Sequence, residues 1–216
     1  MKLENILRLI LNESAEVDEV LTDDSTRQKK LFGSGSFHRV YPSKNNPNIV
    51  YKIGTEAQVN DWLEDFKSNP ELFPKVYRVG YMNIKLPEIW NEFVKGQLKH
   101  YKRGDTIRAK YVELEKFNTK KAKYEWGIIN KAIINFTKNK FDAQILFTKI
   151  GLEDENEKII FELAKYLKQN NEEYQLQILE NFYNLLSKVY EIKPTADVHK
   201  DNFGVDKDGH LKMLDI

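Results

Sequence analysis

Hydrophobic residues recur along the chain with two different periods, one typical of strands and one typical of helices. The strand period dominates the first half, where clusters of turn-forming residues such as Pro42 to Asn48 separate the apolar runs. A helix capped by Thr55 and ending near Lys67 is predicted within this half. The strands predicted on the same basis are residues 37–41, 49–53, 75–81 and 106–114.

Helical spacing marks the beginning of the chain and most of its second half. Leu3, Ile6, Leu7 and Ile10 predict an amphipathic opening helix, which a polar and acidic stretch, residues 12–30, follows. Two apolar stripes predict helices later in the chain: Ile160, Leu163, Ala164 and Leu167, and then Ile178, Phe182, Leu185 and Val189. Strands followed by helices predict an α+β fold with two lobes.

Composition narrows the class of protein. With 216 residues, 41% of them hydrophobic, the chain is long enough to bury a core as one domain or two small lobes. The 34 basic and 33 acidic residues leave a net charge of +1, which argues against nucleic acid or an anionic membrane as a partner. The absence of cysteine excludes disulfides and thiolate metal sites and is compatible with a cytoplasmic location. Glu4, Asn5 and Arg8 interrupt the apolar N-terminus, which is therefore neither a signal peptide nor a membrane span.

Three polar residues near the C-terminus are spaced as a phosphate-handling site requires. Asp197 precedes Asn202 by a few positions, and Asp208-Gly209, a dipeptide that favours a tight hairpin turn, lies between Asn202 and Asp215. A hairpin there would bring Asp215 back beside Asn202. An amide oxygen and a carboxylate together form an oxygen-only site suited to Mg²⁺, and Asp197 would lie within reach of an incoming hydroxyl.

A glycine-containing turn in the first half offers a second candidate site. Its residues are Gly33, Ser34, Gly35, Ser36 and Phe37, and their backbone N–H groups can approach phosphate oxygens closely. Two glycines in a hairpin more often form only a turn. Lys52 strengthens the binding interpretation, because it alternates with Val50 on the following strand and so shares its face, beneath the glycines.

These segments, in this order, resemble the protein kinase superfamily. Gly33 to Val40 is similar to the glycine-rich loop, Val50-Tyr-Lys52 to the strand with the phosphate-binding lysine, Glu115 and Phe117 to the hinge, Asp197 to Asn202 to the catalytic loop, and Asp215 to the aspartate of D-F-G. His199 is similar to the histidine in the same loop of aminoglycoside phosphotransferases. The resemblance implies three segments: an opening helix and linker (1–30), an N-lobe (31–117) with an insertion near 82–105, and a helical C-lobe (118–216).

The resemblance also implies ATP and Mg²⁺ as ligands and a role for each matching residue. Asp197 would be the catalytic base, and His199 would contact phosphate or only brace the loop. Lys52 would contact the phosphates, with Glu56, ranked ahead of Glu64, as its acidic partner, and Asn202 and Asp215 would bind Mg²⁺. Val40 and Val50 would cover the adenine, and Leu114 would be the gatekeeper. The backbone of Glu115 and Phe117 would hydrogen-bond the adenine base.

Several departures keep other interpretations open. His38 replaces the third glycine, Thr195-Ala196 precedes Asp197 where protein kinases have His-Arg, and the sequence stops one residue after Asp215. We therefore expect a minimal kinase, a fragment, or a module that a partner chain completes. The acceptor would be a hydroxyl of a small molecule or a protein. The alternative is a kinase-derived pseudoenzyme that serves as a nucleotide-binding scaffold, and an RNA-binding protein is a more distant one. The many Lys, Asn and Ile residues suggest a bacterial or viral origin.

Overall fold

The computed structural model describes residues 33–34, 38–43, 45–54, 56–85, 106–148, 150 and 154–214. These residues form two compact units, one from the described parts of 33–67 and 75–116, the other from 68–74 and the described parts of 117–214. The predicted opening helix and linker lie outside the described residues, as do Thr55 and most of the predicted insertion. The same holds for four predicted site residues: Gly35, Ser36, Phe37 and Asp215.

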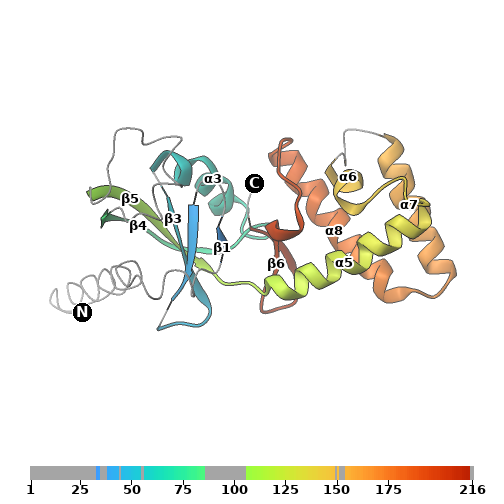
Figure 1. Ribbon diagram of the computed structural model, residues 1–216, viewed down its shortest axis with the longest axis horizontal. Coiled ribbons are helices and arrows are strands. Elements are labelled where there is room, and N and C mark those ends of the chain that lie inside the picture. Colours follow the sequence, from blue (N-terminus) through green and yellow to red (C-terminus); the bar gives the residue numbers. More distant parts are fainter. Residues whose placement is uncertain are drawn as a thin grey trace. The chain divides into compact units, whose positions relative to one another are not determined.

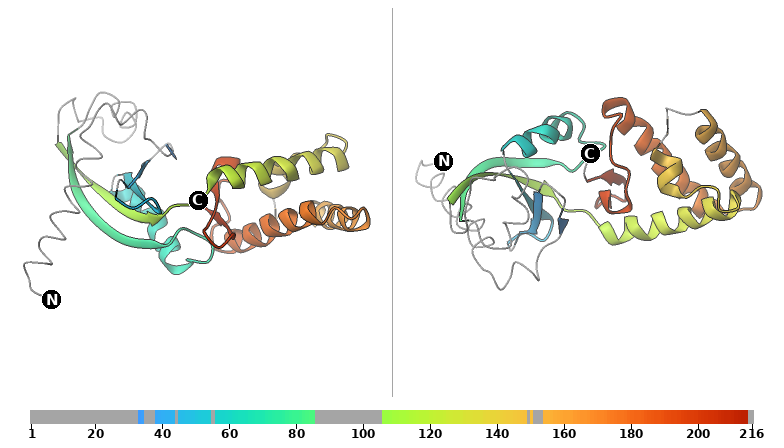
Figure 2. Two further views of the ribbon diagram at one scale, coloured as in Figure 1. Left: turned by 90° about the horizontal axis from the view of Figure 1, so that it is seen from below. Right: turned by 45° about the horizontal axis from the view of Figure 1, so that its top comes forward.

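An antiparallel sheet of five strands forms the first unit, in the order β1-β2-β3-β5-β4. The strands are β1 (Gly33–Ser34), β2 (His38–Pro42), β3 (Ile49–Gly54), β4 (Val76–Lys85) and β5 (Thr106–Glu115). The predicted hairpin is confirmed as the β2–β3 pair. Strands β4 and β5 form a long curved ribbon (Figure 2), in which β4 continues to Lys85 and so into the range expected for the insertion.

One helix, α3 (Glu56–Ser68), belongs largely to the first unit. Its buried side chains are Val59, Leu63 and Phe66, whose helical spacing places them on one apolar face. The helix ends at Ser68, two residues before Pro70, a residue that lacks a backbone N–H and disfavours helix at the preceding position. The chain then passes through the segment 68–74, which belongs to the second unit, before β4 begins.

The second unit is mainly helical (Figure 1). Its elements are α5 (Thr119–Phe136), α6 (Ala143–Thr148), α7 (Asp154–Gln169), α8 (Glu173–Ile192), a 3₁₀ turn η1 (Lys200–Asn202), and the short hairpin β6 (Phe203–Val205) and β7 (Leu211–Met213). Both predicted apolar stripes lie on helices, and their residues are buried except for the half-buried Ala164. The fold is α+β, as predicted. None of the described helices is long and apolar enough to cross a membrane.

Four aromatic rings form the centre of the second unit. Trp126 of α5 stacks on Phe203 of β6, with ring centroids 5.3 Å apart, and both rings contact Phe182 of α8 at 5.3 and 5.2 Å. Phe147 of α6 completes the cluster at 5.8 Å from Trp126. Because Phe203 directly follows Asn202, this cluster fixes the position of the loop that carries the candidate site.

Two glycines of this unit predict opposite effects of the same substitution. A Cβ at Gly204 would lie 2.6 Å from Cβ of Phe117, an atom that moves only with the backbone, whereas a Cβ at Gly127 on α5 would meet nothing within 4 Å. We expect Gly204→Ala to lower the free energy of unfolding by about 1–3 kcal/mol through overpacking. Gly127→Ala should raise it by about 0.5–1 kcal/mol, because alanine favours helix. Urea unfolding of both variants tests this, and equal effects would contradict the packing around Gly204.

Candidate catalytic loop and sheet face

The loop after α8 exposes Asp197 because its neighbours are buried. Ala196 and Val198 are 5% and 1% exposed and anchor the chain in the core of the second unit. The backbone alternates between buried and exposed positions here, so the side chain of Asp197 faces outward. A carboxylate in this position can accept a hydrogen bond from a ligand without breaking a contact in the core.

Asn202 holds the loop together through three hydrogen bonds. Its side-chain Nδ2 donates to the backbone oxygen of Asp197 at 2.9 Å, and its backbone N–H donates to the oxygen of His199 at 2.8 Å. Its own carbonyl accepts from the N–H of Leu214 at 2.7 Å. The last bond brings the residue before Asp215 beside Asn202, as the predicted hairpin requires. Since Nδ2 is used within the loop, the amide oxygen of Asn202 is the atom that remains for a cation.

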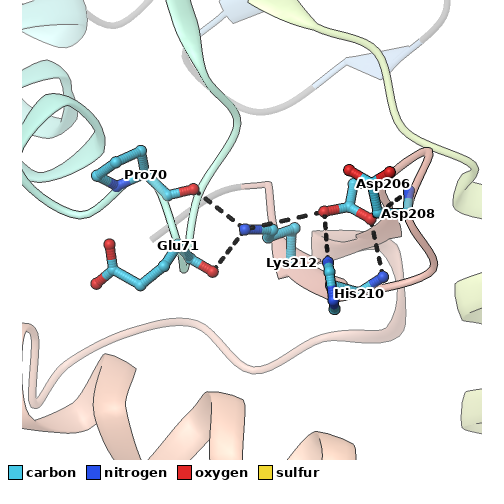
Figure 3. Close-up of polar contacts among 6 residues, drawn as sticks. All are labelled: Pro70, Glu71, Asp206, Asp208, His210 and Lys212. Atoms are coloured by element: carbon cyan, nitrogen blue, oxygen red, sulfur yellow. Dashed lines mark hydrogen bonds and ion pairs between the residues drawn. The ribbon is translucent and has the colours of Figure 1, made fainter.

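The hairpin that returns the chain to Asn202 depends on Asp206. Its Oδ1 accepts from the N–H groups of Asp208 and His210 at 2.9 and 2.8 Å, and its Oδ2 lies 3.3 Å from Nδ1 of His210 (Figure 3). Gly209 completes the turn with a φ of 91°, a left-handed conformation that favours glycine. The Asp208-Gly209 turn predicted from the sequence is therefore confirmed, and Asp206 is the side chain that closes it.

Asp206 predicts a dependence of stability on pH. Burial alone raises the pKa of this carboxyl, but the hydrogen bonds from His210 and from the N–H of Asp208 outweigh burial and lower the pKa below its usual value. A lowered pKa in the folded state contributes stability above the unfolded pKa, about 3.9, and that stability is lost as the pH falls through the folded pKa. Asp206→Asn should therefore be less stable at pH 7, and its deficit should shrink below about pH 4.

Urea unfolding from pH 7 to pH 2 checks this expectation. Asp208→Asn is the matched control, since it changes an exposed carboxyl of the same turn and should stay within about 0.5 kcal/mol of the wild type at pH 7. A deficit of Asp206→Asn that is the same at every pH would show that the ionised carboxylate does not stabilise the turn.

His199 and Asp201 brace the same loop. Nδ1 of His199 lies 3.3 Å from the backbone N of Asp201 and 3.2 Å from its Oδ2. Lys123 of α5 contacts Oδ1 of Asp201 at 2.5 Å, and this bond is the main cause that lowers the pKa of Asp201. Bracing is one of the two roles expected for His199. Contact of its other ring nitrogen with phosphate stays a prediction.

Tyr190 lies near the loop but does not compete with Asp197 as a base. Its hydroxyl is buried at the end of α8, and no described residue lies in ordinary hydrogen-bond geometry to it. Burial raises the pKa of Tyr190 to about 12, with a further rise from the charge of Asp197 and an opposite effect of the Thr148 hydroxyl. The Thr148 hydroxyl donates its own hydrogen bond to the backbone oxygen of Gln144 at 2.6 Å. Tyr190 is therefore neutral at physiological pH.

The first unit collects the expected nucleotide-binding side chains on one face of its sheet. Val40 of β2 pairs with Lys52 of β3, and Val50, two positions before Lys52, pairs with Leu114 of β5. Directly paired residues of antiparallel strands share a face, and so do residues two apart on one strand. Val40, Val50, Lys52 and Leu114 therefore lie on the same face. Gly33 of β1 pairs with Val40, so the first residues of the glycine turn lie on the strand beside Val40.

Lys52 is buried in this face. The residue is 2% exposed, and its Nζ lies 5.5 Å from the ring centroid of Phe66 on α3. Glu56, the acidic partner of Lys52 that the resemblance favours, accepts a hydrogen bond from the hydroxyl of Tyr81 on β4. This bond is the main cause that raises the pKa of Tyr81. Glu64 is exposed on α3. Pairing of Lys52 with either glutamate stays a prediction.

The expected hinge residues make contacts within their own units. The N–H of Glu115 donates to the oxygen of Lys75 at 3.0 Å and is therefore already used within the first unit. The side chain of Phe117 is buried and packs against Gly204. Its role in binding a base stays a prediction.

The predicted metal site includes Asp215, a residue that the structure does not describe. Among the described residues, no group of three or more histidine or acidic side chains is arranged to hold a metal ion. Asn202 fits Mg²⁺ by the chemistry of its amide oxygen, and Asp215 would supply the carboxylate.

No protein-family model matches the chain, and the search of curated proteins finds no match.

Sequence reasoning missed Asp206, Lys123 and Lys212. Only Asp206 carries a local signal, since an aspartate that precedes an Asp-Gly turn is a common side-chain acceptor for the turn's N–H groups. The contacts of the two lysines join segments far apart in the chain, and no spacing reveals them.

Proposed function

We propose that the chain is an ATP- and Mg²⁺-dependent phosphotransferase with a bilobal, protein-kinase-like fold. It transfers the γ-phosphoryl group to a hydroxyl of a small molecule or a protein. The observation that supports this most is the bonding of Asn202. Its amide donates to the backbone oxygen of Asp197, and its carbonyl accepts from Leu214. These bonds connect Asn202, one expected metal ligand, with Asp197, the expected base, and with Leu214, the residue before the other expected ligand.

In the proposed reaction, the carboxylate of Asp197 accepts a hydrogen bond from the acceptor hydroxyl and orients it toward the γ-phosphorus. The new O–P bond forms as the bond between the γ-phosphorus and the bridging oxygen breaks. ADP leaves, and the hydroxyl proton passes to Asp197. Asn202 and Asp215 would hold Mg²⁺, which neutralises phosphate charge when bound. Positioning and charge neutralisation account for the catalysis.

The sheet face of the first unit supports the nucleotide half of the proposal. Val40, Val50 and Leu114 share this face and would supply the apolar side chains that contact a planar base. Lys52 on the same face would hold the phosphates through its ammonium group.

The test is to incubate the protein with ATP and Mg²⁺, measure ADP formation, and record the intact mass. An enzyme forms ADP, and an acceptor hydroxyl within the chain adds the mass of a phosphate. Asp197→Ala should abolish both signals. Binding of ATP without ADP formation in the wild type would instead favour the scaffold.

A further inference from the structure

We propose that Lys212 is a positioning residue that fixes the segment 68–74 to β7, the strand that leads toward the proposed metal ligand Asp215. The inference rests on the proposed function, because it assigns Lys212 a role in holding that site in its working arrangement. Lys212 lies in β7, three residues before Asp215, and no motif of the sequence singles it out.

Strand β7 binds three successive carbonyls of the segment that follows α3. Nζ of Lys212 donates to the oxygens of Pro70 and Glu71 at 3.1 and 2.7 Å (Figure 3). The N–H of Met213 donates to the oxygen of Leu72 at 2.9 Å. Two of these bonds come from one side chain, so a single substitution removes most of the connection.

The ammonium of Lys212 is withdrawn from water, which an ordinary surface lysine avoids. Its side chain is only 11% exposed, and Oδ2 of Asp206 lies 4.0 Å from Nζ. A lysine on a hairpin normally extends its charged end into solvent. Removing that charge from water is unfavourable unless polar groups replace the water, and here two carbonyls and a carboxylate do so. The cluster is therefore a built contact between β7 and the segment 68–74.

This contact lies within the second unit and joins the segment 68–74 to the strand that leads to the proposed metal ligands. On the other side, β7 leads to Leu214, whose N–H bonds Asn202. Leu72 and Phe73 are buried and attach the segment to the second unit, but apolar contacts allow sliding. The directional bonds of Lys212 set where the segment stops relative to β7.

Three variants test the inference: Lys212→Met, which keeps the length without the charge; Lys212→Arg, whose guanidinium can still donate to two carbonyls; and Lys207→Met, the same change at an exposed lysine of the same hairpin. The first readout is hydrogen exchange at the N–H groups of Leu72 and Phe73, which bond the oxygen of Asn69 at 3.0 and 3.2 Å. Exchange should be about tenfold faster in Lys212→Met and unchanged in α8. Lys212→Arg should restore protection, and Lys207→Met should resemble the wild type.

The second readout separates positioning from a structural role. With ATP and Mg²⁺, Lys212→Met should lower kcat about tenfold and leave the KM for ATP within about twofold, and Lys212→Arg should recover most of the rate. Unchanged exchange in Lys212→Met, or faster exchange with wild-type kcat, would overturn the inference. If the wild type forms no ADP, the proposed function fails, and the exchange result alone decides whether Lys212 fixes the segment.

Discussion

Replacing Phe203 with alanine is expected to lower the free energy of unfolding of the second unit by about 3–5 kcal/mol. Phe203 is fully buried, and its ring contacts Trp126 and Phe182 with centroids 5.3 and 5.2 Å apart. The substitution removes these contacts and leaves a cavity beneath the loop that carries the candidate site. Domains are stable by only about 5–15 kcal/mol, so the loss would be a large fraction of the total.

Urea unfolding followed by circular dichroism measures the effect. Phe161→Ala is the matched control, because Phe161 is 58% exposed on α7 and contacts only Tyr183 among the aromatic rings described. Its loss should be at most about 1 kcal/mol, since alanine also favours helix. A loss below about 1 kcal/mol for Phe203→Ala would show that the four-ring cluster is not the centre of the core.

Asp197→Asn is expected to lower the rate of phosphoryl transfer by about 10²- to 10⁴-fold while leaving the fold intact. In the proposed reaction the carboxylate accepts the hydroxyl proton, and an amide at the same position cannot do so. The loop should keep its conformation, because Asn202 bonds the backbone oxygen of Asp197 and not its side chain. The side chain is also exposed, so no core contact changes.

The measurement is the rate of ADP formation at saturating ATP and Mg²⁺, with thermal unfolding as the check on folding. Asp208→Asn, the same change in the nearby turn, should keep the wild-type rate. If Asp197→Asn forms ADP as fast as the wild type, Asp197 is not the base, and the proposed mechanism is wrong.

Local periodicity predicts most of the fold. The stripes of α7 and α8 and the alternation in β2 and β3 arise from burial of one face, which is visible in the sequence itself. Helix α5 shows where prediction from local periodicity ends. Its buried residues Ala122, Trp126, Ile129 and Ile133 are helically spaced, yet the sequence analysis predicts only a helical second half without bounds for this helix. A basic run through Lys123 covers its beginning, and one of those charges serves as the partner of Asp201.

The candidate site likewise has residues that the sequence predicts and contacts that it does not. Asp197, Asn202 and the Asp208-Gly209 turn follow from spacing, because a short loop and a hairpin are local structures. The contacts of Lys212 do not, since its partners Glu71 and Pro70 lie 141 and 142 residues earlier in the chain. The bond between Glu56 and Tyr81 likewise depends on how α3 packs beside β4. Such contacts follow from tertiary packing, which a single sequence does not reveal.

The most direct test of the proposed function is thermal unfolding of the wild type and of Asp215→Asn, each with and without ATP and Mg²⁺. A ligand at 100 times its dissociation constant adds about 2.7 kcal/mol to the free energy of unfolding. We predict a Mg²⁺-dependent rise in Tm for the wild type that Asp215→Asn loses. No rise in the wild type, or an equal rise in both proteins, would contradict a kinase-like nucleotide site built from Asn202 and Asp215.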